Sequence, residues 1–115
     1  MNPESFQSCI DECNSCATMC NYCSISCLHQ PEAQNMIGCI EMNLQCAAIC
    51  RAAAEMMTLG SKYAPQICAI CAEICDACRI ECGKQTMLYC LDCADECKRC
   101  ASACHEMSMT YVPAQ

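Results

Sequence analysis

The sequence predicts an all-α protein, an antiparallel up-down-up-down four-helix bundle with a cysteine-lined core. The cysteines recur at intervals that alternate between three and four, as from Cys9 to Cys27, and they form four such ladders. Residues three and four apart share one face of a helix, so each ladder is one helical stripe. Prolines and glycines separate the ladders by short connections, which make successive helices antiparallel neighbours. We expect residues 1–115 to form a single domain with the four stripes facing inward.

The first two helices are expected at residues 3–28 and 31–59. Pro3 follows an asparagine that can cap the first helix, and proline is favoured at the first helical position. Pro31 marks the boundary between the two helices, because the residue before a proline is disfavoured in the α conformation. Gly60 is expected to cap the end of the second helix.

The last two helices are expected at residues 63–82 and 86–108. The third helix carries a ladder that ends at Cys82, and Gly83 is well placed to stop it. Thr86 is a candidate cap for the fourth helix, whose ladder ends at Cys104. The residues from Val112 onward are expected to form a tail.

The cysteine content indicates reduced thiols more than a disulfide scaffold. The chain holds 19 cysteines in 115 residues, so an oxidised monomer would leave at least one unpaired. Cysteines stacked along one helical face meet disulfide geometry only with strain. The first residues have no basic segment and no apolar segment of a signal peptide. We therefore expect a cytoplasmic protein with free thiols.

The charge and hydropathy of the chain exclude several classes of partner. The net charge is −7 with only six lysines and arginines, which disfavours nucleic acid and anionic lipid. No apolar run approaches the roughly 20 residues that a membrane-spanning helix needs. The sequence contains no nucleotide-binding loop and no pairing of nucleophile and base, so we expect a protein that is not an enzyme.

The thiols are too numerous for an ordinary hydrophobic core. Replacing a buried leucine by cysteine loses roughly 1.5 kcal/mol of burial, at about 0.8 kcal/mol per methylene. Over 19 ladder positions the loss is on the order of 25 kcal/mol, an upper bound because unfolded chains are partly compact. Domains are stable by only about 5 to 15 kcal/mol. Stability alone does not explain such a core.

Metal binding does explain it, because thiolates are ligands for soft metals such as Cu(I), zinc and iron–sulfur clusters. Cu(I) accepts two or three thiolates and tolerates bridging sulfurs, so a column of thiols can hold many ions. Without metal, burial is expected to raise the thiol pKa values and keep the thiols protonated. Exchanging each proton for Cu(I) leaves the charge unchanged. The candidate ligands are Cys9, Cys13, Cys16, Cys20, Cys23, Cys27, Cys39, Cys46, Cys50, Cys68, Cys71, Cys75, Cys78, Cys82, Cys90, Cys93, Cys97, Cys100 and Cys104.

Three alternatives remain open at this point. A zinc protein generally uses four cysteines per ion on loops, whereas these pairs lie within helices. An iron–sulfur or redox protein is suggested by the C-x₃-C-x₂-C spacing of Cys9, Cys13 and Cys16, although any alternating ladder generates that spacing repeatedly. A helical protein stapled by disulfides is the third.

Softer, exchangeable ligands are expected at one end of the bundle, the mouth end. There the first and third helices begin and the second and fourth helices end. Met57 and Met107 continue the ladders of their helices, and His105 lies beside the latter. Either these residues take up metal ions, or the methionines only fill gaps in the core and the histidine is solvated. Cys9 is expected near both methionines and near Cys68.

With repeated C-x₃-C and C-x₂-C pairs on four helices from Cys9 to Cys104, the sequence resembles the bacterial copper storage proteins. The absence of a signal peptide makes it similar to the cytosolic branch. The resemblance implies a homotetramer of four-helix bundles that stores many Cu(I) ions on every ladder cysteine. It also implies uptake at one end, marked by His105 and the methionines, from copper-donating small thiols or chaperones. Met42 or Asn43 stands in the gap of the second ladder, so the number of ions near that layer stays open.

Overall fold

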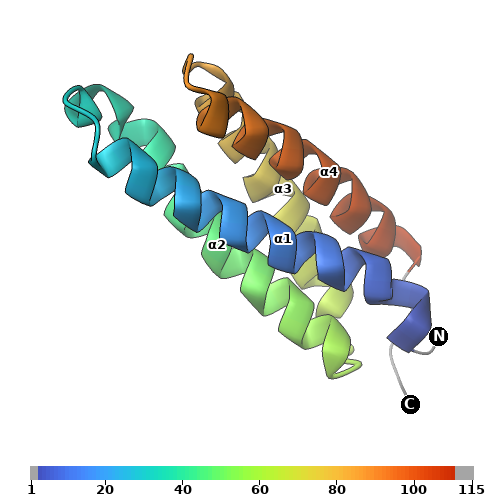
Figure 1. The fold of residues 1–115 in the computed structure, drawn as a ribbon. Helices are drawn as coiled ribbons and strands as arrows, with labels where there is room; N and C mark the ends of the chain where they lie inside the picture. The colour runs from blue at the N-terminus through green and yellow to red at the C-terminus, as the bar shows by residue number, and fades with distance from the viewer. Residues whose placement is uncertain (1–2, 111–115) are drawn as a thin grey trace.

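The computed structural model describes residues 3–110, with side chains from residue 6 onward. Four long helices lie side by side in a bundle about 51 × 19 × 18 Å in extent (Figure 1). They are α1 (Pro3–Leu28), α2 (Ile37–Thr58), α3 (Ala64–Gly83) and α4 (Leu88–Thr110). The predicted four-helix bundle is confirmed. None of the described helices is both long and apolar enough to span a bilayer.

The helices form a closed ring in which each packs against two others. α1 contacts α2 and α4, and α3 contacts α2 and α4, while the backbones on the two diagonals stay apart. The mouth end holds the start of α1, the α2–α3 connection and the end of α4 (Figure 1). The opposite end, which we call the far end, holds the α1–α2 and α3–α4 connections. The ring leaves one axial space that side chains from all four helices fill.

The α1–α2 connection differs from the sequence prediction, which began the second helix at Pro31. The chain instead makes turns and one short 3₁₀ helix, η1 (Ala33–Met36), before α2 begins at Ile37. Backbone hydrogen bonds between residues three apart stabilise this segment. The Ala33 N–H donates to Gln30 O at 3.1 Å, and the Asn35 N–H donates to Glu32 O at 2.9 Å. Such tight turns reverse the chain, and they bury Met36 at the far end of the core.

The other helix ends agree with the sequence in part. Gly60 caps α2 as predicted, with a left-handed φ of 66° that favours glycine, and the next N–H bonds back to Met56 O at 3.1 Å. Gly83 is instead the last residue of α3 and has no positive φ. α4 begins at Leu88, two residues after the predicted start, so the predicted Thr86 cap is wrong. Met87 precedes the helix, and its carbonyl accepts bonds from the Cys90 and Leu91 N–H groups. The predicted asparagine cap and the C-terminal tail lie outside the described residues.

The seam between α1 and α4 contains a buried carboxylate. Glu96 is 6% exposed, and it accepts a hydrogen bond from the Ser15 hydroxyl of α1. The Arg99 guanidinium pairs with its other oxygen at 3.1 Å. These contacts satisfy the charge and tie the two helices that have no direct connection in the chain.

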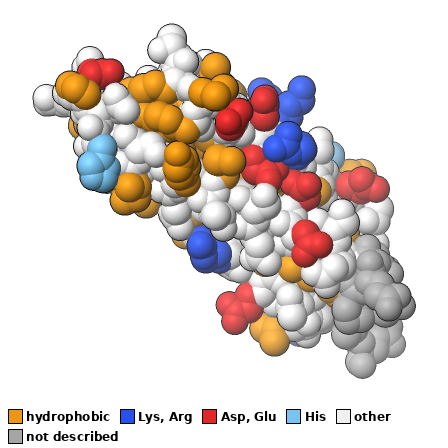
Figure 2. Space-filling model, viewed as in Figure 1, with side chains coloured by type: hydrophobic (Ala, Val, Ile, Leu, Met, Phe, Trp, Pro, Cys, Tyr) orange, Lys and Arg blue, Asp and Glu red, His pale blue; other side chains and the backbone are white. Residues whose placement is uncertain are grey.

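The surface is uneven in its hydrophobic character. Exposed apolar side chains lie near the end of α1 and at the starts of α2 and α4. They are Tyr22, Ile25, Leu28, Ile37 and Leu88. Figure 2 shows hydrophobic side chains gathered over this part of the molecule, toward the upper left. The far end is therefore more apolar outside than the rest of the face in view.

Candidate metal centre

All 19 cysteine side chains point into the axial space. Cys9 is 3% exposed and Cys39 is 1% exposed, and the other 17 are completely buried. None forms a disulfide. The ladder periodicity explains this placement, because a stripe of period about 3.5 stays on the inward face of each helix along the whole bundle. The predicted cysteine-lined core is confirmed, and the disulfide-stapled alternative is wrong for this structure.

The sulfur atoms form one continuous column. Neighbouring Sγ atoms lie 3.2 to 4.0 Å apart, which is van der Waals or weak hydrogen-bond contact and far from a covalent bond. At the mouth end Cys104 is 3.8 Å from Cys9 and 3.4 Å from Cys13. Contacts also cross the diagonal, since Cys50 of α2 lies 3.8 Å from Cys100 of α4. Thiols on opposite helices thus meet at the axis although their backbones do not touch.

The column can be divided into groups of four thiols whose sulfurs all lie within 4.8 Å of one another. Five of these groups are Cys13, Cys71, Cys100 and Cys104; Cys16, Cys46, Cys50 and Cys75; Cys16, Cys20, Cys46 and Cys97; Cys20, Cys78, Cys93 and Cys97; and Cys23, Cys27, Cys39 and Cys90. Three of them share members, so a ligand in one group is a ligand in the next. This arrangement suits a metal that accepts bridging thiolates better than isolated four-coordinate sites.

The thiols do not all have raised pKa values, contrary to the sequence expectation. Burial raises the pKa of Cys27, and it raises that of Cys90 to about 12. Hydrogen bonds with Cys23 and Cys82 instead lower the pKa of Cys39 to about 3. Burial disfavours a thiolate, but neighbouring S–H donors stabilise one. Burial thus favours the neutral thiol at Cys27 and Cys90, while neighbouring S–H donors shift Cys39 in the opposite direction.

Asn43 occupies the gap in the second ladder. It is completely buried, and the step of four residues from Cys39 and three to Cys46 continues the ladder rhythm. Its amide oxygen accepts hydrogen bonds from three thiols, those of Cys78 at 3.1 Å, Cys93 at 3.2 Å and Cys82 at 3.3 Å. Its NH₂ group donates to Cys39 Sγ at 3.4 Å. The amide thus links thiols of α2, α3 and α4 in one layer.

Met42 does not fill this gap, so that part of the expectation is wrong. Its side chain is half-buried beside the column, and its thioether accepts a bond from the exposed Gln45 amide at 3.9 Å. Both positions are three or four residues from each flanking cysteine, but only residue 43 keeps the intervals alternating four, three, four through to Cys50.

Comparison with protein families matches residues 2–109 to the family described as copper storage protein. The chain belongs to the copper storage protein family. This membership favours copper storage over the zinc and iron–sulfur alternatives. The thiol column of this copper storage protein is accordingly a candidate centre for many copper ions.

Individual relatives give the same result. The chain is 39% identical over 84 residues to the uncharacterized cysteine-rich protein YhjQ of Bacillus subtilis, which is 73% of this chain and 78% of that protein. Among solved structures, the Cu(I)-bound copper storage protein BsCsp3 is 39% identical with a TM-score of 0.86, over 89% of this chain and 96% of that one. A cytosolic copper storage protein from Streptomyces lividans, described with five coppers, is 30% identical with a TM-score of 0.90, over 96% and 97%.

Two methionines of this copper storage protein extend the column toward the mouth end. Met57 is completely buried and Met107 is 8% exposed. Cys9 interacts with the thiols of Cys104, Cys13 and Cys68, so its predicted closeness to Cys68 is confirmed. Phe6, one turn before Cys9, is also buried at this end. Phe6 was not among the residues predicted to lie at the mouth end, although it lies three residues before the first ladder cysteine.

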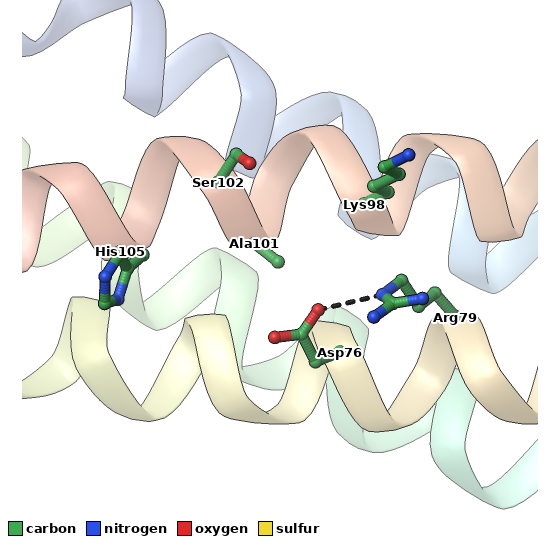
Figure 3. A pocket seen from close by; sticks show the side chains of 6 residues that line it. All are labelled: Asp76, Arg79, Lys98, Ala101, Ser102 and His105. Carbon is green, nitrogen blue, oxygen red and sulfur yellow. Dashed lines mark hydrogen bonds and ion pairs between the residues drawn. The ribbon is translucent and has the colours of Figure 1, made fainter.

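His105 is not brought to the column. Its ring is exposed and lies in an outer groove between α3 and α4, together with Asp76, Arg79 and Lys98 (Figure 3). Asp76 and Arg79 form an ion pair at 2.9 Å in this groove. The reason is helical geometry, because residue 105 directly follows Cys104 and is rotated about 100° away from the inward stripe.

We expect Asn43→Ala to destabilise the metal-free copper storage protein by about 1 to 3 kcal/mol, because three thiols lose their buried acceptor. Urea unfolding of the reduced protein followed by circular dichroism measures the change. Gln45→Ala is the matched control, since it removes an exposed amide from the same helix and should change stability by less than about 0.5 kcal/mol. Equal effects of the two substitutions would contradict the role of the buried amide.

Proposed function

We propose that this protein stores and sequesters Cu(I) without catalysis, by binding many ions to the thiolates of its 19 cysteines. The observation that carries the proposal is the continuous column of buried sulfurs with shared groups of four. A shared thiolate can bridge two Cu(I) ions, so adjacent groups fill as one array. Because each ion replaces a proton, the low-polarity core gains little charge as it loads.

The mouth end is the proposed site of copper uptake. Met57 and Met107 place buried thioethers beyond the last ladder cysteines of α2 and α4, and thioethers bind Cu(I) through sulfur without first losing a proton. The three thiols that interact with Cys9 also lower its pKa, the largest contribution coming from Cys104. Hydrogen bonds that favour the thiolate form of Cys9 would help an ion pass from the thioethers to this sulfur. The exposed ring of His105 lies outside this path, and we do not include it among the ligands.

The relatives support a proposed cellular setting. The Streptomyces relative is described as cytosolic, and reduced thiols require such a compartment. We propose the same location, with copper supplied by small thiols or chaperones.

The exposed apolar side chains at the far end support assembly with further copies of the chain, and a homotetramer is the proposed state. Size-exclusion chromatography with light scattering tests it.

Titration of the reduced protein with Cu(I) in the presence of a competing chelator tests the storage function. We expect more than about ten equivalents to bind, because each ion needs only two or three shared thiolates. Loading should also release protons in weakly buffered solution, since neutral thiols such as Cys90 become ligands. Saturation at about four equivalents or fewer would contradict storage, since it would match the capacity of a few separate four-thiol sites.

A further inference from the structure

Tyr89 covers the column at the far end. Its hydroxyl donates a hydrogen bond to the Met87 thioether at 3.2 Å, and its ring meets the Tyr22 ring edge-on, with centroids 6.4 Å apart and planes at 84°. The two rings line a cleft of about 340 Å³ between α1 and α4, together with Met19, Leu88 and Asp92. This cleft is not on the path through the mouth end.

A complete group of thiols lies directly behind this tyrosine. Cys23, Cys27, Cys39 and Cys90 have their sulfurs within 4.8 Å of one another, and Cys90 is 3.6 Å from Cys23 and 3.7 Å from Cys27. The Tyr89 phenol also interacts with the Cys27 thiol. The Tyr89 phenol thus lies beside one thioether and one ligand thiol. That is the position a metal ion shared by the two sulfurs would take.

Distance makes a second access point useful. The path along α1 from Cys9 to Cys27 covers 18 residues, or about 27 Å at 1.5 Å per residue. An ion admitted at the mouth end reaches the last group only after exchange along the whole column. The far end has the same combination of groups as the mouth end, because the Met87 thioether accepts a bond from Tyr89 and the Tyr89 phenol lies beside Cys27.

We propose that the far end contains a second Cu(I)-exchange site, formed by Met87 and Cys27 and covered by Tyr89. The inference rests on the proposed storage function. When the Tyr89 hydroxyl moves away, Cu(I) passes from a donor thiolate to the Met87 thioether and the Cys27 sulfur. The Cys27 proton passes to the released donor thiolate, and copper keeps its oxidation state. The reverse steps release the ion.

The first test measures access in the metal-free protein, which does not depend on copper binding. Thiols are alkylated for short times and mapped by mass spectrometry. In Tyr89→Leu we expect Cys27 and Cys90 to react at least about tenfold faster than in the unmodified protein, because local opening limits the reaction. Tyr63→Leu, a change at an exposed tyrosine of the α2–α3 connection, is the control and should leave both rates unchanged.

Tyr89→Phe separates gating from loss of the fold. It keeps the ring and removes the hydroxyl with its bond to Met87 and its interaction with Cys27, so labelling of Cys27 and Cys90 should rise at least roughly fivefold, as expected for the loss of one hydrogen bond. If every cysteine reacts faster in Tyr89→Leu, that variant has unfolded and the phenylalanine variant decides. Unchanged labelling of Cys27 and Cys90 in Tyr89→Phe would overturn the proposal.

The second test asks whether copper uses the site. A substoichiometric amount of Cu(I) is added to Tyr89→Leu before brief alkylation, and we expect Cys27 to be protected. Adding Met87→Leu should abolish that protection, whereas Met109→Leu, which removes an exposed thioether near the mouth end, should not. Copper bound elsewhere with Cys27 unprotected would overturn the exchange site alone. A failure of any copper to bind would overturn the storage function, while the labelling result would still report on the cover.

Discussion

Replacing Cys46 and Cys50 together by serine should lower the Cu(I) capacity by about three to four equivalents, more than one ion per thiol lost. The two cysteines belong to the same group of four, and Cys46 also belongs to the next group. Cys50 further connects to Cys100 across the diagonal at 3.8 Å. A hydroxyl is a poor ligand for Cu(I), so removing bridging thiols interrupts the column at its centre. Chelator-competed titration measures the capacity.

The matched control for this double variant is Ala47→Ser, which adds a hydroxyl to the same helix at a buried position outside the column. It should keep the full capacity. Circular dichroism of the metal-free variants checks that both remain helical, since each buried hydroxyl costs up to about 1 to 3 kcal/mol without a partner. An equal loss of Cu(I) capacity in Ala47→Ser would show that packing, and not ligation by thiols, sets the number of bound ions.

Copper loading should raise the thermal unfolding midpoint by at least about 20 °C, the second large effect that we expect. A ligand that binds only the folded chain contributes about 4 kcal/mol at a thousandfold excess over its Kd, and several ions bind at once. That sum exceeds the roughly 5 to 15 kcal/mol by which a domain of this size is usually stable. Ions would also join sulfurs of different helices, such as Cys39 of α2 and Cys82 of α3, which lie 3.2 Å apart.

Scanning calorimetry or circular dichroism of the reduced protein, with and without Cu(I), measures the shift. Copper also binds thiols of the unfolded chain, and this reduces the rise in the unfolding midpoint. The variant with both Cys46→Ser and Cys50→Ser is therefore the informative comparison. Its midpoint should rise less on loading because the array is interrupted. An unchanged midpoint in the unmodified protein would contradict ligation by groups that only the folded bundle brings together.

The far-end connections show where sequence patterns lose precision. Proline at 31 indicated a helix start, but the chain needs several more residues to reverse direction and bury Met36, so α2 begins at Ile37. Likewise α4 begins at Leu88, after a turn closed at Met87. Gly60 was predictable because a left-handed φ is a local requirement of one residue. Turn geometry depends on which side chains the bundle has room to bury, and that is not local.

The sequence alone determined the helices, their inward faces and the chemistry of the core, because a period of three and four residues is a property of one helix and thiols are soft ligands wherever they are buried. Tertiary structure decided which thiols meet. It alone placed Cys50 beside Cys100, put Asn43 among three thiols and left His105 in an outer groove. These relations depend on the rotation and register of helices far apart in the chain, which are set by packing of the whole bundle.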